Sequence, residues 1–209
     1  MINLRVVDLF HGDDVTSFDE AAASGIWGII HKATTGATGK DDKYLARRKE
    51  ATDAGLLWGA YHWGTHADVQ SQVDHFISVA NPDSSTLVAL DFERSGDNTM
   101  TLDQAREFLE RIADKLGRKA VIYSGDLVKT KLGNRVDPFF GGHRLWLAHY
   151  NAHPKVQESW SKYWLWQYTD NTEGLEPNTV AGIPGDDSGN LDCNMFAGTR
   201  EQLKAEWAS

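Results

Sequence analysis

The chain has 209 residues, 41% of them hydrophobic, which is enough to bury one substantial core, and single barrel domains commonly reach this size. Its formal net charge of -9 argues against nucleic acid or an anionic membrane as a partner, because clustered Lys and Arg carry those contacts. No apolar run approaches membrane-spanning length, and strand-like sequence starts without a basic and then apolar leader. We therefore expect no membrane insertion, and the sequence shows no secretion signal, although one can be removed from a mature protein. The single cysteine, Cys193, excludes an internal disulfide framework and argues against a cysteine-rich zinc site.

Strand and helix patterns alternate five times along the first two thirds of the chain. The predicted strands, each with the helix that follows it, are 4–8 and 18–23, 27–34 and 42–54, 57–63 and 68–80, 87–93 and 101–116, and 120–124 and 126–132. The helix over 101–116 is the clearest, since Thr101 and Gln104 form a capping-box sequence and Gly117 ends it. Three further strands, 145–150, 164–169 and 191–194, follow with little helical periodicity between them.

This order indicates the fold class. Alternating strand and helix units favour parallel strands joined by right-handed crossovers, and eight strands favour closure into a barrel. We predict an α/β, irregular TIM-like (β/α)5(β)3 barrel, a single domain over residues 1–209, with helices missing after the sixth strand. No repeat, low-complexity tract or linker indicates a second module. The functional site of such a barrel lies at the carboxyl ends of its strands.

Residues 87–93 form an apolar strand that ends in two carboxylates. Side chains alternate between the faces of a strand, so Asp91 and Glu93 point the same way, and the residues between them form an apolar face. Burial and mutual repulsion raise a carboxyl pKa, which can keep one carboxylic acid protonated beside an ionised one. Asp8 and Asp192 also lie at expected strand ends, so these four acids are candidates for one pocket. The alternative for each is a solvated loop or a helix cap.

Other polar and aromatic residues have two interpretations each. Lys32 is either a buried counter-charge that keeps one Asp ionised or a side chain that extends to solvent. The histidines lack the compact spacing of metal ligands, so we expect structural or rim histidines, no metal and no cofactor. Trp63, Trp146 and Tyr150 lie near strand ends, where aromatic side chains line a groove, although such residues more often belong to a core.

Ten short segments, spread over almost the whole chain, are informative by their order and spacing: VD at 7–8, IIHKAT at 29–34, AG at 54–55, GAYHW at 59–63, DFE at 91–93, VIYSG at 121–125, LWLAHY at 145–150, WQYT at 166–169, GIPG at 182–185 and LDCNMF at 191–196. In order and spacing they resemble the glycoside hydrolase family 25 lysozymes, which are N,O-diacetylmuramidases acting on bacterial peptidoglycan. The chain departs from the family at His11-Gly12, where Gln-Gly is usual, and at Thr35, where Glu is common.

The resemblance implies a role for each acid. It assigns Glu93 as the proton donor and Asp91 as its partner, with Asp8 and Asp192 completing an acidic pocket. It implies an irregular barrel of eight strands with five helices, and glycan strands of peptidoglycan as the substrate. The aromatic residues that it places in the pocket wall are Tyr61, Tyr123 and Trp146.

We therefore predict a peptidoglycan hydrolase that cleaves the β-1,4 bond between N-acetylmuramic acid and N-acetylglucosamine by carboxylate acid/base catalysis. Inversion, retention and attack by the substrate's own acetamido group all stay open, since strand spacing does not separate them and an Asp-x-Glu order suits the last. The rival classes are a non-catalytic peptidoglycan- or chitin-binding barrel, a chitinase- or glucosaminidase-like enzyme and a metal-dependent deacetylase-like hydrolase. We expect a monomer that reaches the cell wall as a released phage endolysin or by an export route that the sequence does not reveal.

Overall fold

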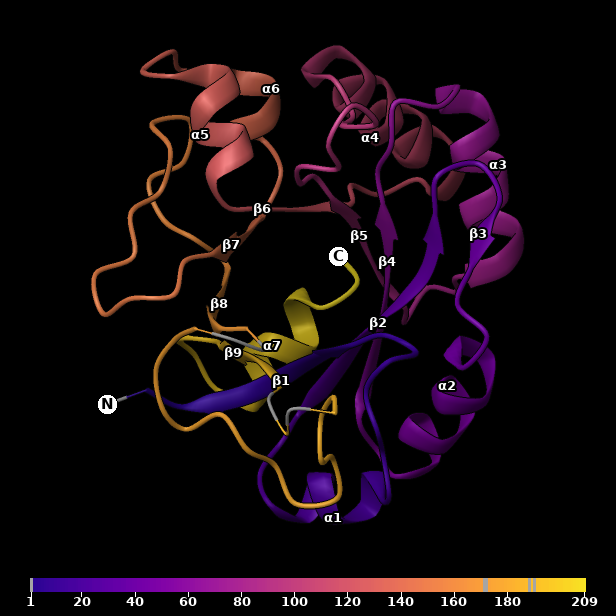
Figure 1. Ribbon diagram of the computed structural model, residues 1–209, viewed down its shortest axis with the longest axis vertical. Helices are drawn as coiled ribbons and strands as arrows, with labels where there is room; N and C mark the ends of the chain where they lie inside the picture. Colours follow the sequence, from indigo (N-terminus) through magenta and orange to yellow (C-terminus); the bar gives the residue numbers. More distant parts are fainter. Residues whose placement is uncertain (1, 171–172, 188, 190) are drawn as a thin grey trace.

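Eight strands close into a barrel in the computed structural model, which describes residues 2–170, 173–187, 189 and 191–209 (Figure 1). In chain order they are β1 (Leu4–Leu9), β2 (Gly28–Thr35), β4 (Leu57–Trp63), β5 (Leu87–Asp91), β6 (Val121–Ser124), β7 (Leu145–Ala148), β8 (Leu165–Thr169) and β9 (Asp192–Met195). The order around the barrel is β1-β9-β8-β7-β6-β5-β4-β2, and pairing of β1 with β2 closes it. The predicted eight-stranded barrel is confirmed.

The barrel is parallel except at β9, which runs antiparallel to both β1 and β8. This corrects one expectation, because Asp192 lies at the start of its strand and not at the end. The reversal still brings Asp192 to the carboxyl edge of the barrel, where it is the Cα partner of Asp8 in the register of β1 and β9. A short strand that was not predicted, β3 (Gly39–Lys40), pairs with the end of β2 outside the ring.

The five predicted helices follow five of the strands. They are α1 (Phe18–Ala23), α2 (Tyr44–Asp53), α3 (Val69–Ala80), α4 (Leu102–Leu116) and α5 (Asp126–Leu132). The capping box of Thr101 and Gln104 opens α4, and Gly117 ends it in the left-handed conformation. None of the helices over the described residues is long and apolar enough to cross a membrane.

Two short helices were not predicted: α6 (Pro138–Gly141) and α7 (Arg200–Glu206). The second one makes the expectation of no helix after the sixth predicted strand wrong. Its sequence gives almost no apolar period, because Leu203 is its single buried residue. Thr199 and Gln202 nevertheless form a complete capping box, so the sequence signal for this helix is its N-terminal cap and not an apolar period.

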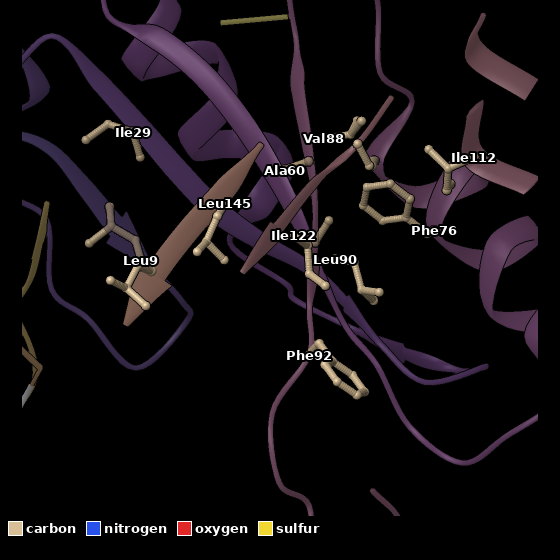
Figure 2. Packing of buried hydrophobic residues seen from close by; sticks show 14 of the residues in the cluster. Leu9, Ile29, Ala60, Phe76, Val88, Leu90, Phe92, Ile112, Ile122 and Leu145 are labelled. Atoms are coloured by element: carbon tan, nitrogen blue, oxygen red, sulfur yellow. The ribbon is translucent and has the colours of Figure 1, made fainter. Parts of the chain in front are cut away.

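Two layers of apolar side chains hold the barrel together. On the outer side of the sheet, Phe76 of α3 and Ile112 of α4 pack toward Val88 and Leu90 of β5 (Figure 2). Phe92 extends the same face, which confirms the apolar face expected beside the two carboxylates. The inner layer starts with side chains from the beginnings of the strands, together with two from the carboxyl-terminal segment: Val6, Ile30, Leu87, Val121, Leu165, Leu203 and Trp207.

The carboxyl-terminal segment seals the amino-terminal end of the barrel. The Trp207 indole N–H donates to the Trp58 carbonyl at 2.7 Å. A Cβ on Gly28, the first residue of β2, would lie 2.9 Å from the Trp207 ring, so a glycine is needed where the helix meets the strand. With this end filled by apolar side chains, the polar groups of the interior lie toward the other end.

Candidate active site

Asp91 and Glu93 lie on one face at the carboxyl end of β5. Asp91 is the last residue of the strand and is 4% exposed, while Glu93 lies two residues further on. The Phe92 N–H donates to the Tyr123 carbonyl of β6 at 2.9 Å, which keeps the chain extended past the strand end and preserves the alternation of faces. Asp91 therefore lies deep, and Glu93 lies nearer the opening.

Glu93 faces a groove with a volume of about 560 Å³. The wall of this groove comes from the segments that follow β5, β6 and β7, together with Glu173: Glu93, Arg94, Gly125, Asp126, Leu127, Ala148, His149, Tyr150, Asn151 and Glu173. An elongated substrate can thus reach Glu93 from the carboxyl end of the barrel.

Burial raises the pKa of both carboxyls. For Asp91 the pKa lies well above its usual range because of burial and because of the charge of Glu93, and Lys32 opposes the rise. For Glu93 burial again raises the pKa, the Tyr123 hydroxyl opposes this rise, and the Asp170 carboxylate adds to it. Two acids coupled in this way titrate as a pair, and the raised pKa values favour a state in which one proton is held between them. That is the charge state which acid/base catalysis at a glycosidic bond requires.

Lys32 provides the positive charge beside this pair. Its Nζ lies 4.7 Å from the centre of the Trp63 ring, and 5.6 Å and 5.8 Å from those of Phe10 and Tyr61. The three rings direct the ammonium group toward the pocket, where it lowers the pKa of Asp91 and Glu93. Of the two interpretations of Lys32, the structure favours the counter-charge.

Asp8 and Asp192 form a second acidic pair across β1 and β9. The Asp8 carboxyl accepts a hydrogen bond from Asn194 Nδ2 at 2.7 Å and from Gln167 Nε2 at 2.9 Å. Burial raises the pKa of Asp8 to about 7 against these two donors, and burial and the charge of Asp8 raise that of Asp192 well above its usual range. Asp8 accepts hydrogen bonds from two amide groups, whereas the buried Oδ1 of Asp192 has no hydrogen-bond partner among the described residues. The shared proton therefore lies on Asp192.

The predicted aromatic residues occupy three different positions. Tyr61 and Tyr123 are buried beside the acids, while Trp63 and Tyr150 are partly exposed at the rim. Trp146 lies beneath them, 1% exposed, with its ring edge-on to Tyr123 at 4.5 Å. Since no face of its ring is open, Trp146 supports the tyrosines in this structure and offers no stacking surface to a sugar.

The structure adds two residues that sequence reasoning did not select, Gln167 and Asn194. Both are buried and both donate to Asp8. A signal for Gln167 existed: it is a polar residue between Trp166 and Tyr168 in a buried strand, and by alternation it points into the barrel while its neighbours point outward. Polar groups in such positions need partners, and here the partner is an acid.

His149 lines the groove, whereas His31, His62 and the cysteine lie apart from it. His62 stacks on Phe108 at 4.8 Å and bonds Thr34 and Gln72, while His31 stacks on Trp58. Cys193 is buried among apolar side chains, as strand alternation predicts. Over the described residues, no group of three or more His, Cys, Asp or Glu side chains is arranged to hold a metal ion.

A closed barrel that buries paired carboxyls beside an open groove is the architecture of an enzyme that hydrolyses glycosidic bonds. Comparison with known proteins agrees with this class. The sequence model of the family described as "Glycosyl hydrolases family 25" matches residues 7–175. The chain therefore belongs to glycosyl hydrolase family 25, as the order and spacing of the short segments indicated.

Individual relatives agree with this family assignment. Lysozyme M1 of Streptomyces globisporus is 26% identical over 214 residues, covering 95% of this chain and 69% of that lysozyme. The crystal structure of a bacterial lysozyme from Streptomyces coelicolor is 25% identical, with a TM-score of 0.84 over 99% of this chain and 97% of the other. A muramidase from Acremonium alcalophilum shares the fold, with 24% identity and a TM-score of 0.82 over 99% of both chains. Family, relative and fold together support a lysozyme-type, peptidoglycan-hydrolysing glycosidase.

Proposed function

We propose that this protein is a muramidase that hydrolyses the β-1,4 bond between N-acetylmuramic acid and N-acetylglucosamine in peptidoglycan glycan strands. The observation that carries the proposal is the Asp91–Glu93 pair, buried at the carboxyl end of β5, with Glu93 on an open groove. Family membership supplies the reaction class, and the lysozyme and muramidase names of the relatives supply the substrate. No cofactor is needed for this chemistry.

In this proposal Glu93 donates its proton to the glycosidic oxygen as the bond breaks. A raised pKa suits that task, because the acid must be protonated near neutrality. Asp91 lies deeper, and its buried Oδ1 has no hydrogen-bond partner among the described residues. An acetamido N–H of the substrate would satisfy this oxygen and turn the acetamido oxygen toward the reacting carbon. The pair therefore fits substrate-assisted cleavage best.

Asp8 and Asp192 complete the pocket beneath this pair. One shared proton leaves the Asp8–Asp192 pair with a single negative charge, and the amide groups of Gln167 and Asn194 stabilise that charge by donating to Asp8. We propose that they hold the pocket together and shape its field, while Lys32 limits the total negative charge around the developing positive carbon. Tyr150 in the groove wall and Trp63 at the rim are the aromatic side chains that would meet the sugar rings, with Tyr61 buried behind them beside the acids.

We also propose that the catalytic unit extends over residues 1–209, beyond the 7–175 that the family model matches. β9 carries Asp192 and Asn194, and α7 fills the barrel end, so neither is dispensable for the fold. We expect a monomer that acts on the bacterial cell wall, because the groove and all four acids come from one chain.

The direct test is digestion of purified peptidoglycan followed by reduction and mass spectrometry of the fragments. We expect N-acetylmuramic acid at every new reducing end. Reducing-end N-acetylglucosamine would instead show a glucosaminidase, and binding without new reducing ends would show a non-catalytic barrel. Cleavage that survives prolonged chelation is expected, since the proposed chemistry uses side chains of this chain alone.

A further inference from the structure

Arg94 lies in the wall of the same groove as the proposed proton donor. It comes directly after Glu93, and both residues line the cavity of about 560 Å³. Among the lining residues that the structure describes, Arg94 is the only lysine or arginine, whereas Glu93, Asp126 and Glu173 are acids. The groove therefore presents one permanent positive charge among three carboxyl groups.

A contact with α5 places the guanidinium group of Arg94. Its Nη2 donates to Thr130 Oγ1 at 3.2 Å. Thr130 lies one turn after Asp126 on the same face of α5, and Asp126 itself lines the groove. The hydrogen bond thus holds the guanidinium along the wall that α5 contributes to the groove.

The charge of Arg94 has no carboxylate partner within the described part of the chain. None of the ion pairs between described residues includes it, although three carboxyl groups line the same groove. The single bond to Thr130 leaves most of the guanidinium N–H groups unused, and these donors are spaced to bind a carboxylate. An exposed arginine is common on protein surfaces, but this one lies where a substrate must pass to reach Glu93.

Peptidoglycan strands carry carboxylates close to the bond that we propose is cleaved. N-acetylmuramic acid bears a lactyl ether, whose carboxyl group is either free or joined to a peptide stem that has carboxylates of its own. A groove lined by acids repels such groups, because like charges at short range raise the free energy of the complex. Arg94 provides the opposing charge, whereas a polymer of N-acetylglucosamine has no carboxylate for it to bind.

We propose that Arg94 is a specificity residue of the groove: its guanidinium binds a carboxylate of the muramic acid substituent and so favours peptidoglycan over neutral β-1,4 polymers of N-acetylglucosamine. The proposal rests on the proposed muramidase function, which supplies the substrate. The carboxylate is present before and during bond cleavage, so Arg94 contributes equally to the ground state and the transition state. Its loss should therefore raise KM and leave kcat in place.

The test compares Arg94→Gln with the parent on three soluble glycan strands. The first strand carries its peptide stems, and the second has been stripped by an amidase and keeps free lactyl carboxylates. The third is the stripped strand after its carboxyl groups have been converted to amides. We expect Arg94→Gln to raise KM roughly five- to tenfold on a strand with the recognised carboxylate, with kcat within about twofold of the parent. On the amidated strand both proteins should have the same KM.

The same strands distinguish the two sources of the carboxylate. A rise in KM on the stripped strand identifies the lactyl carboxylate, and a rise on the peptide-bearing strand alone identifies the stem. An unchanged KM on both strands overturns the proposal. An equal rise on the amidated strand also overturns it, because Arg94 would then bind something other than a carboxylate.

Arg200 provides the matched control. It is an exposed arginine at the start of α7, and its Nη2 donates to the Gly55 carbonyl at 3.3 Å. Arg200→Gln removes the same charge away from the groove and should leave KM unchanged on all three strands. A rise equal to that of Arg94→Gln would attribute the effect to the net charge of the protein and would overturn the site.

Binding measurements keep this proposal separate from the proposed function. Glu93→Gln lacks the proposed proton donor, so calorimetry can measure the Kd of each strand for this variant with and without Arg94→Gln. We expect Arg94→Gln to raise Kd roughly five- to tenfold on the recognised strand and not on the amidated one. A parent that does not cleave peptidoglycan would contradict the proposed function, whereas equal Kd values would contradict the role of Arg94.

Discussion

The four acids of the pocket form two pairs with different surroundings. Asp8 and Asp192 are enclosed, and amide groups of Gln167 and Asn194 fill the acceptor sites of Asp8. Glu93 instead opens to a groove, and a buried oxygen of Asp91 has no partner among the described residues. Asp192 Oδ1 likewise has no partner among the described residues, so the groove beside Glu93 is what distinguishes the two pairs. We propose that the chemistry takes place at the Asp91–Glu93 pair, because a substrate in the groove can reach Glu93.

Replacing Glu93 with glutamine should remove the proton donor and keep its shape. We expect Glu93→Gln to lower kcat by roughly 10²- to 10⁴-fold, with glycan binding largely retained. Asp91→Asn should cost less, because an amide can still bond the acetamido group while losing the charge. The measurement is kcat and glycan affinity of both variants over a range of pH. Substantial turnover in Glu93→Gln with an unchanged alkaline limb would move the acid to Asp91 or Asp192.

The proton on Asp192 should make stability depend on pH. In the unfolded chain this carboxyl ionises near pH 4, whereas burial keeps it protonated in the folded protein. The folded state then binds more protons, so the free energy of unfolding falls as the pH rises above 4. Asp192→Asn imitates the protonated acid and should remove about 1–3 kcal/mol of this fall between pH 5 and 7. Urea unfolding at the two pH values measures it, and parallel profiles would contradict the assignment.

At the scale of single residues, the sequence predicted which side chains share a face of a strand. It did not predict roles that depend on hydrogen bonds to residues far away in the sequence. The common face of Asp91 and Glu93 follows from a two-residue step along one strand. Gln167 acquires its role only from Asp8, which is far away in the sequence, and no local pattern encodes that pairing. Asp192 was placed in the right pocket by the wrong reasoning, since its strand runs in the opposite direction.

At the scale of elements, apolar periodicity predicted α4 and failed for α7. α4 has a full apolar stripe of four buried residues, whereas α7 buries one. Both begin with the same capping box, in which a threonine and a glutamine exchange hydrogen bonds. A capping box outside a periodic segment therefore deserves the same weight as one inside it, because the cap satisfies the same free N–H groups in either helix.

The cap of α4 can be tested by a single substitution. Thr101→Ala removes the side-chain oxygen that accepts from the Gln104 N–H at 3.2 Å. We expect a loss of about 1 kcal/mol in the free energy of unfolding, with kcat unchanged, since the cap lies outside the pocket. Thr101→Ser keeps the hydroxyl and is the matched control. Equal destabilisation by both variants would attribute the loss to the methyl group and not to the cap.

The whole molecule divides its tasks between the two ends of the barrel. The carboxyl end holds the acids, amides and tyrosines, and it stays open to the groove. The amino end is filled by apolar side chains from the strand beginnings, by α7 and by Trp207, which follows α7. In barrels of this kind the first end carries function and the second carries stability. This division follows from the strand directions, which the alternating sequence pattern predicted. The same pattern did not predict that α7 seals the amino end.

Trp207 tests this division, because it anchors the seal at the amino end of the barrel. Its ring lies against Gly28 and Trp164, and its N–H donates to the Trp58 carbonyl. Trp207→Ala leaves a large cavity and a buried carbonyl without its donor, so we expect a loss of about 3–5 kcal/mol in the free energy of unfolding. Trp207→Phe should cost less, since most of the volume is kept. At a temperature where all variants are folded, kcat/KM on peptidoglycan and the Glu93 titration midpoint should match the parent. A fall in kcat/KM without unfolding would show that the two ends of the barrel are coupled.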